Sequence, residues 1–485
     1  MHLLRWFNRE KITLLIASLA LALGAVFPWY RLPPQALETF GINLSLVNAG
    51  RVLVALFALL GFAFTFCFSL NRAPRLPLWS GLIVVLLFPY LISTWFPSVN
   101  FLAASYYDQG TRVSQYIDKN FSQVQAQWKQ NIQLDQAKPI KTIFNFSIKD
   151  SRFFQISSWD CFLIGGLGYS NSFFGFIGRG WGFAVVGFAI GLLALYLGLE
   201  SNNFDLFITD LGKIMPWVGL LIGALVFSMI LPNFMNFQLN TMLAKGEYRQ
   251  AVAISQILIS LYPPLSGDAT FLQHLAEAGF YAQKPDSGLL YFAKGLERYA
   301  SGDLLKAEDY FQRSLDIEPS HFLVRGYLAA ASLSQGVNYF NNPDIKTFNQ
   351  HKPGAAADRF EEALRIFPGH IEALYDLMLA RVVDGEFEKS AVVAQQIIET
   401  QQYPQNPNLS LLAQAYVHSA WASYRNGDTT QAWKQYRQSI DSNTWKQSDS
   451  WRSQKSGVRR KPIDECSGFG QDARFSCSTY LNPGF

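Results

Sequence analysis

A pattern of small, aromatic and proline residues in the second half of the chain constrains the fold more than any other feature. In the 34 residues from Gly288 to His321, the pattern consists of Gly295, Gly302, Ala307, Phe311, Ser314 and Pro319. A small alanine lets two helices approach closely, a glycine allows a tight turn, and a proline ends a helix. The spacing therefore predicts two antiparallel helices joined by a short turn.

The same spacing returns in four other stretches, with some positions substituted. These units are Pro232–Leu265, Phe322–His370, Ile371–Pro404 and Ala413–Lys446. The unit Phe322–His370 takes Gly336 as its turn glycine and carries an insertion before Ala356, and residues 271–283 add one helix between the first two units. Because each unit can bury its apolar face only against its neighbours, the repeats predict a stacked helical array.

The repeated unit resembles the tetratricopeptide repeat, including the Ala307 and Phe311 pair that packs one helix against the next. The resemblance implies a concave surface formed by the first helix of each unit, which binds proteins or peptides. Large aromatic side chains are favoured at such binding surfaces, although the same rings can instead pack between neighbouring helices. The residues expected to face this surface, called here the predicted groove, are Phe292, Leu296, Tyr299, Tyr375, Leu379, Val382, Val417, Trp421 and Tyr424.

The first half of the chain is poor in charge. Of the 40 Lys and Arg residues, 16 lie in residues 1–236, and of the 36 Asp and Glu residues, 10 lie there. A bilayer is crossed by about 20 apolar residues, so long uncharged runs predict membrane-spanning helices. Such runs are Ile12–Tyr30, Val52–Leu70, Trp79–Pro97, Trp181–Leu199 and Ile214–Met235.

Loop charges predict how these five spans would be oriented. Positive residues favour the cytoplasmic side, and Arg5, Arg9, Lys11, Arg72, Arg75 and Lys213 would lie there if the N-terminus were inside, against Arg31 and Arg51 outside. Everything after Met235 would then lie outside the cytoplasm, in the periplasm of a bacterial cell. The spans contain no ionisable residue, which argues against an ion-coupled transporter.

Residues 98–180 are expected to form a small extracytoplasmic domain of mixed helix and strand. Apolar residues recur every three or four positions from Val113 to Ile132, which predicts a helix, and Phe144, Phe146 and Ile148 alternate with polar residues as in a strand. The glycine-rich stretch Phe162–Gly178 is expected to be a re-entrant or interfacial segment of the membrane. A sixth crossing there remains the alternative, and it would place the array in the cytoplasm.

No catalytic, cofactor or metal site is expected. The histidines in the repeat region stand alone, without the spacing of a metal-binding pair. The stretch Gly175–Gly182 is rich in glycine but lacks the strand and helix of a phosphate-binding loop. Cys466 and Cys477 lie in a tail with little core of its own, so we expect a disulfide between them, which an oxidising compartment would preserve.

These observations predict a mainly α-helical protein with a five-helix transmembrane bundle, an α-solenoid of tetratricopeptide type and a small α+β domain. We expect a scaffold anchored in the plasma membrane of a bacterium. It would assemble an envelope complex with other membrane or periplasmic proteins and with lipid, as part of an oligomer and without nucleic acid. In layout only, it resembles the septal-junction proteins of filamentous cyanobacteria. The alternative function is a channel or export subunit whose array recruits cargo. The expected domains are 1–97, 98–180, 181–236, 237–446 and 447–485.

Overall fold

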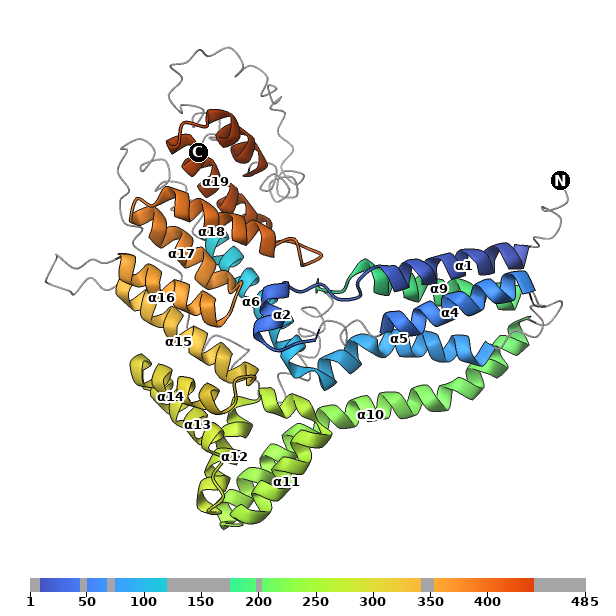
Figure 1. The fold of residues 1–485 in the computed structure, drawn as a ribbon. Coiled ribbons are helices and arrows are strands. Elements are labelled where there is room, and N and C mark those ends of the chain that lie inside the picture. The colour runs from blue at the N-terminus through green and yellow to red at the C-terminus, as the bar shows by residue number, and fades with distance from the viewer. Residues whose placement is uncertain are drawn as a thin grey trace, which may run out of the picture.

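The structure is a computed structural model that describes residues 9–43, 50–67, 75–119, 175–197, 203–341 and 353–439. Within these ranges the chain is helical and forms no strand, and Tyr30 and Ile177 make an isolated antiparallel bridge. Residues 429–439 are also helical. The elements, labelled as in Figure 1, are α1 (Arg9–Val26), α2 (Pro34–Thr39), α4 (Gly50–Cys67), α5 (Arg75–Trp95), α6 (Pro97–Lys119), α9 (Arg179–Leu197), α10 (Asn203–Lys245), α11 (Tyr248–Leu261), η5 (Pro263–Gly267), α12 (Ala269–Tyr281), α13 (Ser287–Ala300), α14 (Leu304–Ile317), α15 (Phe322–Asn341), α16 (Pro353–Ile366), α17 (Ile371–Val383), α18 (Phe387–Thr400) and α19 (Leu409–Arg425).

Four apolar helices, α1, α4, α5 and α9, form a bundle on one side of the molecule, and the long helix α10 runs back from it to the array (Figure 1). Small residues let these helices approach one another. A Cβ atom on Gly187 of α9 would lie 2.7 Å from Cγ of Leu21 on α1, and a Cβ atom on Gly24 of α1 would lie 3.0 Å from the amide nitrogen of Ala184. Close backbone approach therefore holds α1 against α9.

The outer faces of this bundle carry apolar side chains that the chain itself leaves exposed. Leu19 on α1 is 51% exposed, and Val52 and Leu59 on α4 are 67% and 66% exposed. Large apolar surfaces of this kind generally mark sites of interaction with other molecules. The bundle thus buries a narrow core and presents apolar faces outward.

The prediction of five membrane-spanning helices is wrong, because the described ranges contain no helix that combines the length and the apolar character needed to cross a membrane. The helices also differ in extent from the apolar runs. Helix α1 contains Arg9, Glu10 and Lys11 and ends at Val26, so Trp29 lies outside it. The structure also contradicts the predictions that depended on these spans, namely the orientation, the plasma-membrane localisation and the periplasmic position of the array. The resemblance in layout to septal-junction proteins was based on the same five spans, and the structure gives it no support.

The second half of the chain forms a row of helices in which each packs against the next in sequence, from α11 to α19 (Figure 1). The pairs α13–α14, α15–α16 and α17–α18 occupy three of the repeat units, and α12 is the additional helix between the first two units. Ala307 and Phe311 of α14 are fully buried, as the spacing predicts. The spacing of the repeats therefore predicted the helices of these three units.

Glycines close the turns between paired helices. Gly246, Gly302, Gly385 and Gly427 have φ angles between +76° and +82°, a conformation that side chains with a Cβ atom rarely adopt. Gly336 does not serve as a turn, contrary to the sequence pattern, because it lies inside α15, where a Cβ atom would be 2.5 Å from the ring of Phe360. The unit that contains α15 is therefore shifted in register relative to the others.

The described part of residues 98–180 gives no small α+β domain, so that prediction is also wrong. Helix α6 occupies 97–119, and the apolar positions Val113 and Ile117 are buried. The strand expected near Phe146 lies outside the described residues, as do most of Phe162–Gly178, His351 and the pair Cys466 and Cys477.

Segments from the first half of the chain join the core of the array. Helices α2 and α6 lie between the bundle and the array (Figure 1). One continuous apolar cluster contains Leu37 of α2, Leu102 of α6 and Leu323 of α15, together with residues of every array helix from α11 to α19. The two halves of the chain are therefore packed as one structure.

Candidate functional site

Helix α6 lies along one face of the array. Its neighbours there are α15, α17 and α19, the first helices of three consecutive pairs, together with η5. We call this surface of α15, α17 and α19 the inner face. Phe101 of α6 comes so close to α15 that a Cβ atom on Gly326 would lie 2.5 Å from its ring. The inner face is thus covered by a helix of the same chain.

Aromatic rings form the apolar part of this contact. Phe101 lies 5.3 Å from Phe322 of α15, and Tyr106 lies 5.7 Å from Phe367, as measured between ring centroids. Phe40, which follows α2, packs edge-on against Phe367 at 5.0 Å. Edge-to-face and tilted arrangements at these distances are favourable for aromatic pairs. Rings from both halves of the chain therefore share one cluster.

Polar groups of α6 complete the beginning of α17. The first N–H groups of a helix have no partner within that helix and need an external acceptor. The backbone N–H of Ile371 donates a 2.9 Å hydrogen bond to Oε1 of Gln109, and both groups are buried. Nδ1 of His370 accepts from the N–H of Ala373, and the Tyr106 hydroxyl donates to the carbonyl oxygen of Pro368 at 2.6 Å. Helix α6 thus accepts from the N–H of Ile371, while His370 of the array itself accepts from the N–H of Ala373.

A group of charged side chains lies beside this contact, one turn further along α6 and one residue further along α17. Nη2 of Arg112 on α6 lies 3.0 Å from Oε1 of Glu372 on α17, and its Nε lies 3.2 Å from Oδ2 of Asp108. The side chain of Glu372 has no exposed surface. Burial raises the pKa of Glu372 to about 8, although Arg112 acts to lower it and Asp108 adds to the rise. The contact between α6 and α17 is therefore sensitive to the protonation of Glu372.

Two histidines near this face are held neutral. Burial lowers the pKa of His370 to about 3, and the charge of Arg112 lowers it further. Burial alone lowers the pKa of His418, on α19, to about 3. A neutral imidazole keeps Nδ1 of His370 available as the acceptor for Ala373. These histidines serve packing and capping, and no group of His, Cys, Asp and Glu that could hold a metal occurs in the part of the chain that the structure describes.

The residues of the predicted groove are spread over several environments. Phe292 is fully buried and packs 5.6 Å from the ring of Tyr327, while the hydroxyl of Tyr299 shares a hydrogen bond of 2.9 Å with Oγ of Ser334. Leu296 is half-buried against the same core. Phe292 and Tyr299 of α13 thus contact helix α15.

The groove residues on α17 and α19 also differ in exposure. Tyr375, Leu379 and Val382 are at most 5% exposed, and the charge of Tyr116 on α6 raises the pKa of the Tyr375 hydroxyl, after the larger effect of burial. On α19, Trp421 is 7% exposed and packs 4.6 Å from Phe387, Val417 is half-buried, and Tyr424 is 38% exposed. The structure thus places Tyr375 beside α6. Of the three aromatic groove residues on α17 and α19, Tyr424 is the most exposed, and Tyr375 and Trp421 are buried.

Sequence reasoning missed the role of α6. The apolar positions Val113, Tyr116 and Ile117 correctly indicated a helix, but they were interpreted as part of a separate domain. The polar residues Gln109 and Arg112 lie on the same stretch and point to a specific partner, because buried polar groups need matched contacts. Their partners, 260 or so residues away, carry no sequence signal that links them to α6.

No protein-family model matches the chain, and no curated protein matches it either. The resemblance of the repeats to tetratricopeptide repeats therefore depends on the residues of this chain alone.

Proposed function

We propose that this chain is an interaction scaffold with a helical array of the tetratricopeptide type, whose inner face holds a helix. The observation that carries the proposal is α6, which lies across the first helices of three consecutive pairs. Positive-φ glycines at the turns and the buried Ala307 and Phe311 pair support the assignment of the repeats. Holding an amphipathic helix in a groove is a common mode of protein recognition.

The bound helix α6 has the features of a ligand. It combines aromatic anchors such as Phe101 with a buried hydrogen bond that Gln109 accepts and a contact between Arg112 and the buried Glu372. Aromatic and arginine side chains of this kind dominate binding energies at interfaces. A helix from another protein could bind the inner face only after α6 has left it. Its apparent affinity would therefore be reduced in proportion to the fraction of chains in which the inner face is free.

Partners of the scaffold are expected to be proteins. The net charge of +4 is too small to favour nucleic acid. The exposed apolar residues of the bundle, such as Leu59, offer surface for assembly with other chains. Because α6 ties this bundle to the array, a partner bound to either part would be held at a fixed orientation relative to the other.

A competition experiment with the full chain tests the proposal. A fluorescent peptide of residues 97–119 is titrated into the wild-type chain and into a variant in which Phe101→Ala and Tyr106→Ala weaken the internal contact. We expect the variant to bind the peptide at least tenfold more tightly than the wild type, because the inner face becomes free more often.

The controls separate recognition from unfolding. A Gln115→Ala chain, changed at an exposed position of the same helix, should bind the peptide no better than the wild type. A peptide that itself lacks the Phe101 ring should bind the weakened chain poorly. Equal, weak binding of both peptides to a weakened chain that keeps its helical circular dichroism would refute the proposal.

A further inference from the structure

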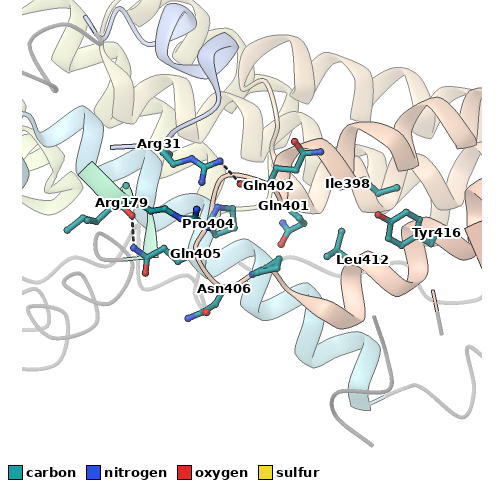
Figure 2. A pocket seen from close by; sticks show the side chains of 13 residues that line it. Arg31, Arg179, Ile398, Gln401, Gln402, Pro404, Gln405, Asn406, Leu412 and Tyr416 are labelled. Carbon is teal, nitrogen blue, oxygen red and sulfur yellow. Dashed lines mark hydrogen bonds between the residues drawn. The ribbon is translucent and has the colours of Figure 1, made fainter. Parts of the chain in front are cut away.

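An open pocket of about 740 Å³ lies where the first half of the chain meets the loop between α18 and α19 (Figure 2). One wall consists of Arg31 with the segment 177–179. The opposite wall consists of the end of α18, Gln401, Gln402, residues 404–407 and the first turns of α19. Pockets of this volume commonly hold small organic ligands.

Hydrogen bonds fix the two walls relative to each other. Gln405 donates from its backbone N–H to the carbonyl oxygen of Gly175 at 2.7 Å and from its side chain to the carbonyl oxygen of Ile177. Nη2 of Arg31 donates to the carbonyl oxygen of Gln402 at 3.2 Å (Figure 2). The pocket is therefore formed before any ligand binds, which reduces the entropy lost on binding.

The pocket is positively charged. Its lining includes the exposed side chains of Arg31 and Arg179 and contains neither Asp nor Glu. Among the described residues, no carboxylate forms an ion pair with either arginine. Helix α9 begins at Arg179, so the positive end of its dipole adds to the charge of this wall. Two guanidinium groups without a carboxylate partner favour an anion, which arginine can bind through two parallel hydrogen bonds.

The far side of the pocket is apolar. Ile398 of α18 and Leu412 and Tyr416 of α19 line it, and their side chains lie together on the side away from Arg179 (Figure 2). The amide side chain of Gln401 lies between the charged and apolar sides (Figure 2), and Asn406 also lines the pocket, so both add hydrogen-bonding groups. A ligand that fills the pocket would thus be charged at one end and apolar at the other.

We propose that this pocket binds a small organic anion, a carboxylate or phosphate group joined to a short apolar arm. The anionic group lies at Arg31 and Arg179, and the arm packs against Leu412 and Tyr416. Since the ligand contacts both walls, its binding stabilises the junction between the first half of the chain and the α18–α19 loop. This site is separate from the inner face and does not depend on the proposed scaffold function.

Isothermal titration calorimetry on the full chain at physiological ionic strength tests the site with phenyl phosphate and phenylacetate as probes. We expect at least one of them to bind saturably, and the tighter of the two identifies the phosphate or the carboxylate as the preferred group. Arg179→Gln should weaken binding at least tenfold, because a charged hydrogen bond is lost. Arg179→Lys should give an intermediate loss, since an ammonium group keeps the charge without the paired geometry.

Arg249→Gln is the matched control, because Arg249 is an exposed arginine on α11 that does not line the pocket. It should leave the affinity unchanged. The proposal is overturned if neither probe binds, or if Arg179→Gln and Arg249→Gln bind equally well. Inorganic phosphate that bound as tightly as phenyl phosphate would overturn the role of the apolar side.

Discussion

Replacing Gln109 by methionine tests whether α6 completes the start of α17. Methionine is close to glutamine in length and volume, so the change removes the acceptor of the 2.9 Å hydrogen bond from Ile371 and keeps most of the packing. A buried N–H left without an acceptor costs roughly 1–3 kcal/mol. A middle value of about 2 kcal/mol corresponds to about a 30-fold increase in local opening.

Hydrogen exchange followed by mass spectrometry measures this opening directly. Peptides that cover the start of α17 should exchange about 30 times faster in Gln109→Met than in the wild type. Gln115→Met is the matched control, because Gln115 lies on the same helix with its side chain exposed. Exchange of this segment that differed less than threefold between the two variants would refute the role assigned to Gln109.

Two further predictions concern the core of the array. The pKa of Glu372 is about 8 in the folded chain, above the value of about 4.3 expected in an unfolded chain. Folding therefore takes up a proton between these pH values, and the free energy of unfolding falls as the pH rises from about 4.5 to 8. Glu372→Gln should lose less stability than the wild type between pH 5 and 9 in urea denaturation, and parallel stability curves would contradict the assignment. Gly295→Ala should destabilise the chain by about 1–3 kcal/mol, because the added Cβ atom would lie 2.4 Å from the ring of Phe311. Gly212→Ala should stabilise the chain by about 0.5–1 kcal/mol, because Gly212 lies inside α10 with open space around it. Equal denaturation midpoints for the two variants would refute this difference.

The array could be predicted from the sequence because its structure is local. Most pairs of helices show a small residue, a glycine turn and an apolar stripe at short range, and these features recur along the chain. Gly336 shows the limit of this reasoning, because a glycine can serve either a turn or a close contact, and only the position of Phe360 decides between them.

The first half could not be predicted in the same way. Its uncharged runs indicated helices correctly, but the apolar character of a run does not determine where a helix begins and ends, as Arg9 and Val26 of α1 show. The contact between α6 and the array joins residues that are far apart in sequence. A single sequence contains no signal that relates Gln109 to Ile371 or Arg112 to Glu372.

The buried polar contacts of α6 explain how one register is chosen on an apolar face. An apolar helix could shift along the inner face by one turn, about 5.4 Å, and still bury its rings. Such a shift would separate Gln109 from the N–H of Ile371 and Arg112 from Glu372, leaving buried groups without partners. A buried hydrogen-bonding group left without a partner costs roughly 1–3 kcal/mol. The polar residues thus make the shifted arrangements costly, and the aromatic rings hold α6 in place once the register is set.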